Sequence, residues 1–283
     1  MTTEKLTVNG VDLSIYCYPV TTYSGLLTSP RRKSGNLPVA GRHGTLRVPR
    51  KRYDEAQVVL PMTVAGATAA GLVPSGSTEQ QEFYKRTDEL LRLFHAELVT
   101  LDHTLPDGSV RRAVGEVTDV MDFTRLPLGQ AARVSVALTV PGAFWSDLTA
   151  VTVGPVALTT GATASLTAFV GATAPMDDLV ITFGPGANPT LAQPLTGAFV
   201  AYDGVIASGR TLTVNTETWE VTGSIDAGGT WSPSITAVRF GPEAKFFWLT
   251  PPHDGSAPVV SLAHTAGGSM AVTVSGKRRY LAG

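Results

Sequence analysis

Short stretches of alternating apolar and polar or small residues recur along the chain, separated by glycine and proline. In residues 132–140 every second residue is a large aliphatic one: Val134, Val136, Leu138 and Val140. A period of two places these side chains on one buried face of a β-strand. The 283 residues include 29 glycines and 19 prolines, enough turn-forming residues to join many short strands. The sequence therefore predicts a mainly β protein.

Two further patterns in the first half of the chain indicate strands. Residues 98–101 and 110–114 flank Pro106-Asp107-Gly108, where proline presets the turn and glycine accepts a positive φ, so a β-hairpin is predicted. Residues 55–64 form another candidate strand. Because Pro61 lacks an N–H, we expect that strand to lie at an edge of the sheet or to contain a bulge.

One segment has helical rather than strand periodicity. Between Ser77 and His95 the apolar spacing is that of an amphipathic helix, carried by Phe83, Thr87, Leu90, Leu91 and Phe94. Ser77 and Gln80 form a candidate capping box. We expect the apolar stripe to pack on a sheet.

The length favours two domains, and we expect each to be a β-sandwich, the first with the helix and a long arm. We place the boundary after residue 147, giving domains 1–147 and 148–283, with residues up to about Pro175 read as a Thr/Ala/Gly/Val-rich connection. Beyond it, turn residues separate eight short candidate strands, which predict a β-sandwich or jelly roll. These strands are residues 179–183, 197–202, 211–214, 218–221, 237–240, 246–249, 259–262 and 270–274.

The single cysteine and the hydropathy pattern bear on where in the cell the protein is expected. Cys17 alternates with Leu13 and Ile15, so we expect it to be a buried core residue rather than a nucleophile. No apolar stretch is long enough to span a bilayer, and the first residues lack the pattern of a secretion signal. We expect the protein to be made and kept in a cytoplasm.

No motif in the chain provides catalytic chemistry. The five histidines lack metal-binding spacing, and there is no nucleophile elbow, phosphate loop or dinucleotide fingerprint. The adjacent carboxylates Asp177-Asp178 and Asp88-Glu89 are interpreted as solvated. We therefore predict no catalytic residues, no metal and no cofactor. Trp231, in a Gly-rich segment, is a candidate exposed aromatic residue in a loop, whereas the other tryptophans are expected in cores.

A long basic segment, which we call the arm (residues 21–54), has no acidic residue between Asp12 and Asp54. It could bind nucleic acid, form a solvated hairpin or pack on a neighbouring subunit. Interspersed apolar residues favour the third interpretation. The candidate interface residues are Arg31, Arg32, Lys33, Gly41, Arg42, Gly44, Arg47 and Arg50, and candidate carboxylate partners on the helix of the next subunit are Glu79, Glu82, Asp88 and Glu89.

Several of these features occur together in one known family. Ala40-Gly-Arg-His-Gly44 resembles the Gly-Arg-x-Gly turn of the distal tail proteins of long-tailed bacteriophages, although Ala40 and His43 stand where proline and an acidic or amide residue are common. The helix, the closing hairpin and Phe144-Trp145 follow in the order found there. The segment from Asn188 to the final Arg279-Tyr-Leu is similar to the galectin-like second domain of that family.

This resemblance implies a non-enzymatic virion protein at the phage tail tip. It implies a hexameric ring that joins the tail-tube protein to the tail-tip or adsorption apparatus and leaves a channel through which DNA passes as cargo. The alternatives are a carbohydrate-binding module or adhesin acting through residues 148–283, a β-sandwich glycoside hydrolase, and another tail-tube or baseplate component.

Overall fold

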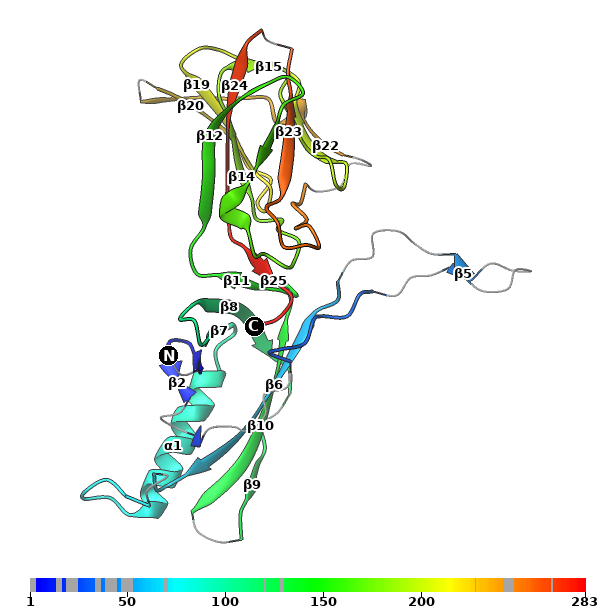
Figure 1. Cartoon of the computed structure of the whole chain (residues 1–283). Helices are drawn as coiled ribbons and strands as arrows, with labels where there is room; N and C mark the ends of the chain where they lie inside the picture. The colour runs from blue at the N-terminus through cyan, green and yellow to red at the C-terminus, as the bar shows by residue number, and fades with distance from the viewer. Residues whose placement is uncertain are drawn as a thin grey trace. The chain divides into compact units, whose positions relative to one another are not determined.

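The computed structural model describes residues 4–13, 17–18, 25–33, 37–38, 45–46, 53–68, 71–119, 121–127, 130–226, 228–241, 247–265 and 267–283. The chain forms two compact units (Figure 1). Unit 1 contains Met1–Ser146 together with Leu281–Gly283, and unit 2 contains Asp147–Tyr280.

Unit 1 is built on a large antiparallel sheet with the order β2-β1-β7-β8-β10-β6-β3, and β9 pairs with β10. Its strands are β1 (Lys5–Val8), β2 (Val11–Asp12), β3 (Cys17–Tyr18), β6 (Ala56–Ala65), β7 (Val99–Thr104), β8 (Val110–Val117), β9 (Phe123–Arg125), β10 (Ala131–Val140) and β11 (Trp145–Asp147), the last of which pairs with β8. Cys17 lies opposite Val64 in the sheet. Its side chain is not among those described, so its burial stays a prediction.

The longest ladder of unit 1 joins β6 and β10, which pair from Ala56↔Val140 to Ala65↔Ala131. The alternating aliphatic face predicted for β10 is confirmed, since its four large residues are at most 3% exposed. Along β6, the described pairing on the side away from β10 is with β3 and covers Thr63 and Val64. Within the described residues, Pro61 therefore has a strand on one side, as suits a residue without an N–H.

The predicted hairpin is confirmed as β7 and β8. Gly108 closes its turn with φ +86°, and Leu105 N–H donates to Ser109 O at 2.8 Å. The Asp107 carboxylate accepts hydrogen bonds from the Ser109 hydroxyl (2.6 Å) and N–H (2.9 Å). These two hydrogen bonds lower the pKa of the exposed Asp107 carboxyl, because they stabilise its charged form.

Helix α1 (Glu79–Phe94) lies along the sheet of unit 1 (Figure 1). Its apolar stripe buries Phe83, Leu90 and Phe94. Leu91 is 39% exposed, contrary to prediction, because it lies about 100° around the helix from Leu90. The capping box is also one residue later than predicted.

That capping box consists of Thr78 and Gln81. The Thr78 hydroxyl accepts from Gln81 N–H at 3.2 Å, and the Gln81 side chain accepts from Thr78 N–H at 2.9 Å. The backbone of Thr78 is extended (φ −92°, ψ 154°), as an N-cap residue requires. Ser77 therefore precedes the cap.

Unit 2 is a sandwich of two antiparallel sheets with the orders β12-β24-β14-β19-β20-β21 and β13-β23-β16-β17-β22. Its elements are β12 (Val151–Thr159), β13 (Thr163–Ser165), the 3-10 helix η2 (Thr167–Phe169), β14 (Val180–Phe183), β15 (Gly186–Ala187), β16 (Thr190–Gln193), β17 (Ala198–Tyr202), β18 (Val205–Ile206), β19 (Arg210–Asn215), β20 (Val221–Ile225), β21 (Gly229–Trp231), the 3-10 helix η3 (Ile235–Ala237), β22 (Val238–Gly241), β23 (Val259–Ala263), β24 (Ser269–Gly276) and β25 (Arg279–Tyr280). Phe169, Phe183 and Phe247 are fully buried in the core of unit 2. The predicted mainly β, β-sandwich fold class is confirmed.

Some strands of unit 2 differ from the prediction. The Thr/Ala/Gly/Val-rich connection contains β12, which pairs with β24 from Val151 to Thr159 and has a bulge between Val153 and Val156. That bulge, at Gly154-Pro155, interrupts the period of two and hides the strand from sequence analysis.

Two other predicted strands are corrected. Within residues 247–249 the structure has no strand, although Phe247 and Leu249 are core residues and Leu249 forms an isolated bridge with Met176. Strand β20 starts at Val221, because a turn at residues 216–218 and Trp219, with φ +62°, come before it. Among the described residues, no helix is long and apolar enough to cross a bilayer.

Candidate assembly surface

Residues 31–32 and 53–54 of the arm lie side by side. Arg32 and Tyr53 form an antiparallel bridge, and Asp54 N–H donates to Arg31 O at 2.6 Å. Farther along, β4 (Leu37–Pro38) pairs with β5 (Thr45–Leu46), which is labelled in Figure 1. These pairings show that the chain folds back on itself between Arg31 and Asp54.

The first part of the arm is fixed to the body of unit 1. Gly25 has φ +94°, and a Cβ built there would lie 2.1 Å from Gln57 O, so this close approach requires glycine. Leu26 is 1% exposed, and its carbonyl oxygen accepts from Gly283 N–H at 2.6 Å. A Cβ on Gly283 would lie 2.5 Å from the Trp145 ring. The last residues thus hold the arm against the buried Trp145.

The described basic residues of the arm are exposed and held by weak local contacts. The Arg32 guanidinium lies 5.4 Å from the centre of the Tyr53 ring and donates to the Tyr53 hydroxyl at 3.2 Å. Lys33 Nζ lies 3.7 Å from the Asp54 carboxylate, and both side chains are more than half exposed. Contacts of this kind contribute at most about 1 kcal/mol, so they leave these cations available to a partner.

The other predicted interface residues lie outside the described residues. They are Gly41, Arg42, Gly44, Arg47 and Arg50. Their role in an interface stays a prediction.

The acidic residues predicted on the helix do not form one exposed face. Glu82 is buried, with its carboxylate 4.0 Å from Arg86 Nε, so its assignment as a partner for a neighbouring subunit is corrected. The Glu79 carboxylate accepts from Gln130 N–H at 3.4 Å. Asp88 is exposed and Glu89 is half-buried. Arg86, one turn after Glu82, donates to Ala65 O at 2.8 Å, so this edge of the helix packs against the end of β6.

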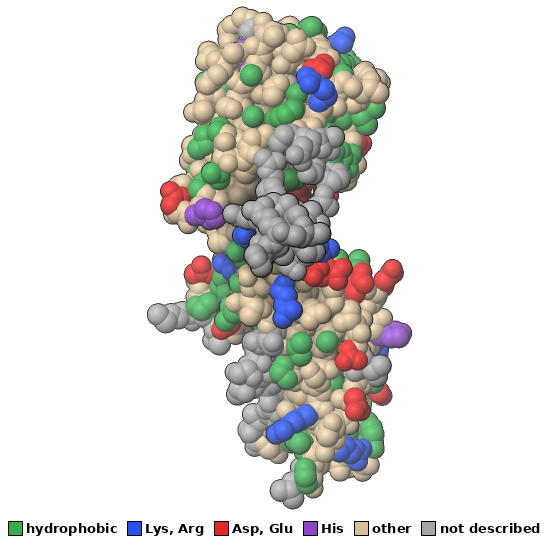
Figure 2. All heavy atoms as spheres, turned by 90° about the vertical axis from the view of Figure 1, so that its right-hand side faces the viewer, with side chains coloured by type: hydrophobic (Ala, Val, Ile, Leu, Met, Phe, Trp, Pro, Cys, Tyr) green, Lys and Arg blue, Asp and Glu red, His purple; other side chains and the backbone are tan. Residues whose placement is uncertain are grey.

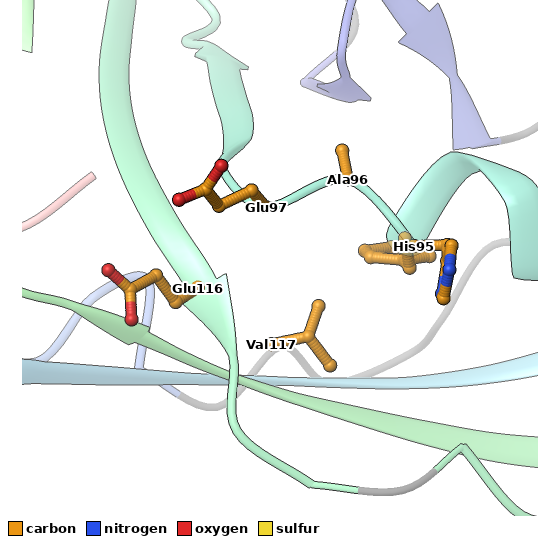
Figure 3. Close-up of a pocket in the computed structure, with 6 residues that line it drawn as sticks. His95, Ala96, Glu97, Glu116 and Val117 are labelled. Carbon is orange, nitrogen blue, oxygen red and sulfur yellow. The ribbon is translucent and has the colours of Figure 1, made fainter.

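A different acidic surface lies at the end of α1. Phe94, His95, Ala96, Glu97, Glu116 and Val117 line an open hollow of about 410 Å³, which we call the acidic hollow. Figure 3 shows the carboxylates of Glu97 and Glu116 on one side of it and the His95 ring on the other. Sequence analysis missed this hollow because residues 94–97 and 116–117 meet through the pairing of β7 with β8.

Trp231 is not the exposed loop residue that was predicted. It ends β21 and is half-buried. Gly223 opposite it has no side chain, and a Cβ there would lie 2.4 Å from the Trp231 indole nitrogen. The indole N–H donates to Thr211 O at 3.0 Å. The ring therefore fills a slot on the inner face of the sheet, the face that carries the buried Leu212.

The adjacent carboxylates Asp177 and Asp178 both form an ion pair with Arg279. Arg279 lies 2.5 Å from an Asp177 oxygen and 3.4 Å from an Asp178 oxygen. Asp177 is exposed, as predicted, but Asp178 is largely buried, and this burial raises the pKa of its carboxyl. The arrangement is an ion-pair cluster at the surface of unit 2.

The described residues contain no cluster suited to a metal ion, in that no three His, Cys, Asp or Glu side chains converge. His103 is fully buried, but its Nε2 is 2.7 Å from the Glu4 carboxylate and its ring packs edge-on against Trp145. The five histidines thus include one that supports the core of unit 1.

Charged side chains are unevenly distributed between the units. On the faces visible in Figure 2, unit 1 carries many Lys, Arg, Asp and Glu side chains, whereas unit 2 carries few.

Solved structures with a similar fold are known. The chain is similar to the crystal structure of the Dit protein (gp 19.1) of phage SPP1, a paradigm of the hub adsorption apparatus in phages that infect Gram-positive bacteria, with a TM-score of 0.61 at 14% identity. The match covers 98% of this chain and 99% of that one. The chain has a distal tail protein fold. The resemblance inferred from the sequence is confirmed at the level of the fold.

Two structures of the phage p2 baseplate in its activated conformation, with Sr and with Ca, also match. Each is 9% identical, with TM-scores of 0.36 and 0.33, and the matches cover 97% and 98% of this chain and 98% of each of those chains. No family model and no curated protein matches the sequence.

Proposed function

We propose that the protein is a non-enzymatic structural component of a phage tail tip, assembled in the host cytoplasm and carried in the virion. Six copies form a ring that joins the tail tube to the adsorption apparatus and leaves a channel for DNA. The observation that carries the proposal is the similarity to the SPP1 Dit protein along nearly the whole of both chains.

The arm supplies the contact between neighbouring copies. Its sequence has no acidic residue before Asp54, the chain folds back on itself, and Gly25 and Leu26 fix its first part to unit 1, which suits a projection that docks on another subunit. A ring repeats one heterologous contact that closes on itself, so a single arm and a single docking surface per copy suffice.

A glycan-binding role for residues 148–283 has less support. Sugar recognition needs an exposed aromatic face beside polar groups, and the Trp231 ring is half-buried between Gly223 and the edge of Tyr202. Binding of the full chain to a glycan array would favour that role instead. If the protein is instead another tail-tube or baseplate component, imaging of the phage particle would show it away from the tail tip.

The test compares the full chain with a variant in which a short Gly/Ser linker replaces residues 34–51, which leaves the buried Leu26 in place. Light scattering and negative-stain imaging at low salt should show six-membered rings for the full chain and monomers for a variant whose circular dichroism is unchanged. High salt should weaken the rings, since ions screen contacts between exposed charges. Rings formed by the variant, or a full chain that stays monomeric at high concentration, would refute the role of the arm.

A further inference from the structure

We propose that the acidic hollow of unit 1 receives basic side chains from the arm of a second copy. This inference rests on the proposed ring, because it names the surface on which the arm docks. It assigns the contact to Glu97 and Glu116, because Glu82, one of the acids first predicted on the helix, is buried.

The electrostatics of the acidic hollow favour a cation. Glu97 and Glu116 are both exposed, and Figure 3 shows their carboxylates on the same side of it. In the described part of the chain neither carboxylate forms an ion pair, unlike Asp102, which binds Arg112 at 2.6 Å. The hollow also adjoins the last turn of α1, where helix carbonyl groups add partial negative charge.

The lining of the hollow suits an arginine or lysine rather than a free small cation. Val117, which is half-buried, and Ala96 give the hollow apolar surface beside its carboxylates, and the buried Phe94 closes its wall. A long basic side chain can lay its methylene groups on such a surface while its charged end reaches the acids. Metal ions prefer three or more converging oxygen or nitrogen ligands, and the described residues provide no such group.

The arm is the chemically matched occupant within this protein. Between Asp12 and Asp54 it has basic residues and no carboxylate of its own. At its described base, Arg32 is held by Tyr53 and Lys33 by Asp54. The basic residues beyond these, among them Arg42 and Arg47, lie outside the described residues, and the sequence places no Asp or Glu among them. In a ring, one hollow and one arm per copy make one repeated contact.

The experiment measures binding of a fluorescent peptide with the sequence of residues 30–53 to the full chain at low salt by anisotropy. A Glu97→Gln/Glu116→Gln variant should bind the peptide about 3- to 10-fold more weakly, the effect of two partly exposed charge pairs. An Asp88→Asn/Glu89→Gln variant loses the same formal charge from the helix and should bind within about twofold of the original chain. The difference should vanish at high salt.

A charge exchange provides the decisive comparison. A peptide with Arg42→Glu and Arg47→Glu should bind poorly to the original chain and regain affinity for a Glu97→Arg/Glu116→Arg variant. The proposal is overturned by no peptide binding to the original chain, by an equal loss in the helix variant, or by failure of the exchange to restore affinity. If replacing residues 34–51 abolishes rings while Glu97→Gln/Glu116→Gln leaves rings and peptide affinity unchanged, the hollow is refuted and the ring proposal stands.

Discussion

Replacing Trp145 by alanine should strongly destabilise unit 1. Trp145 is 1% exposed, packs against the buried His103 ring at 6.3 Å between centroids, and supports Gly283 beside the arm. A buried tryptophan removes roughly 150 to 250 Å² from water, worth about 4 to 6 kcal/mol as an upper bound. Measured truncations of buried aromatic residues cost about 3 to 5 kcal/mol. We therefore expect Trp145→Ala to lower the free energy of unfolding of unit 1 by about 3 to 5 kcal/mol.

The assay is urea unfolding of the full chain followed by circular dichroism at a helix-sensitive wavelength. Among the described residues the one α-helix, α1, belongs to unit 1, so its signal reports on that unit even if the two units unfold separately. Trp219→Ala is the matched control, because this half-buried residue contacts Phe240 in unit 2. The control should shift the helix transition by less than about 0.5 kcal/mol.

A loss below about 1 kcal/mol for Trp145→Ala would contradict the reasoning. It would mean that the site collapses around the smaller side chain or that Trp145 is not packed as described. Equal shifts for the two tryptophan variants would mean instead that the units unfold as one, and the helix signal would then not isolate unit 1.

Three other predictions follow from the same contacts. Thr78→Ala should destabilise unit 1 by about 1 kcal/mol in the same urea assay, because Gln81 N–H loses its capping oxygen; Ser77→Ala should have little effect. A fragment of residues 147–280 should fold alone, with a circular dichroism spectrum of strands and no α-helix, and an unfolded fragment beside a stable full chain would contradict the division into units. Because burial raises the pKa of the Asp178 carboxyl, the stability that this group contributes when protonated is lost as pH rises through that raised pKa. Asp178→Asn should therefore make the thermal midpoint of the fragment less sensitive to a change from about pH 3 to pH 7, and an unchanged pH profile would contradict it.

Local sequence pattern determined much of unit 1. The alternation in residues 132–140 predicts β10 because a strand with one buried face needs an aliphatic residue at every second position. Pro106-Asp107-Gly108 predicts the turn from the backbone angles that proline and glycine accept. The helix was predicted from its 3.6-residue period, but its N-cap was placed one residue too early. Ser77 and Thr78 are both N-cap residue types, and only the backbone conformation of the folded chain decides that Thr78 is the N-cap.

The sequence also indicated the distal tail protein fold, through the order of several short motifs rather than through any one of them. It did not reveal β12, because Gly154-Pro155 interrupts the period of two that identifies a strand. Only its pairing with β24 distinguishes this segment from a connection.

The sites depended most on tertiary structure. Trp231 looked exposed because glycines precede it, yet the missing side chain of Gly223, on the neighbouring strand, creates the slot that its ring fills. Glu97 and Glu116 face one hollow because the pairing of β7 with β8 brings them together. Local pattern fixes which residues can form a strand or helix, because backbone conformation and side-chain spacing are local properties. Which charges share a surface and which aromatic ring is covered depend on contacts between distant residues, and these exist only after the sheets have formed.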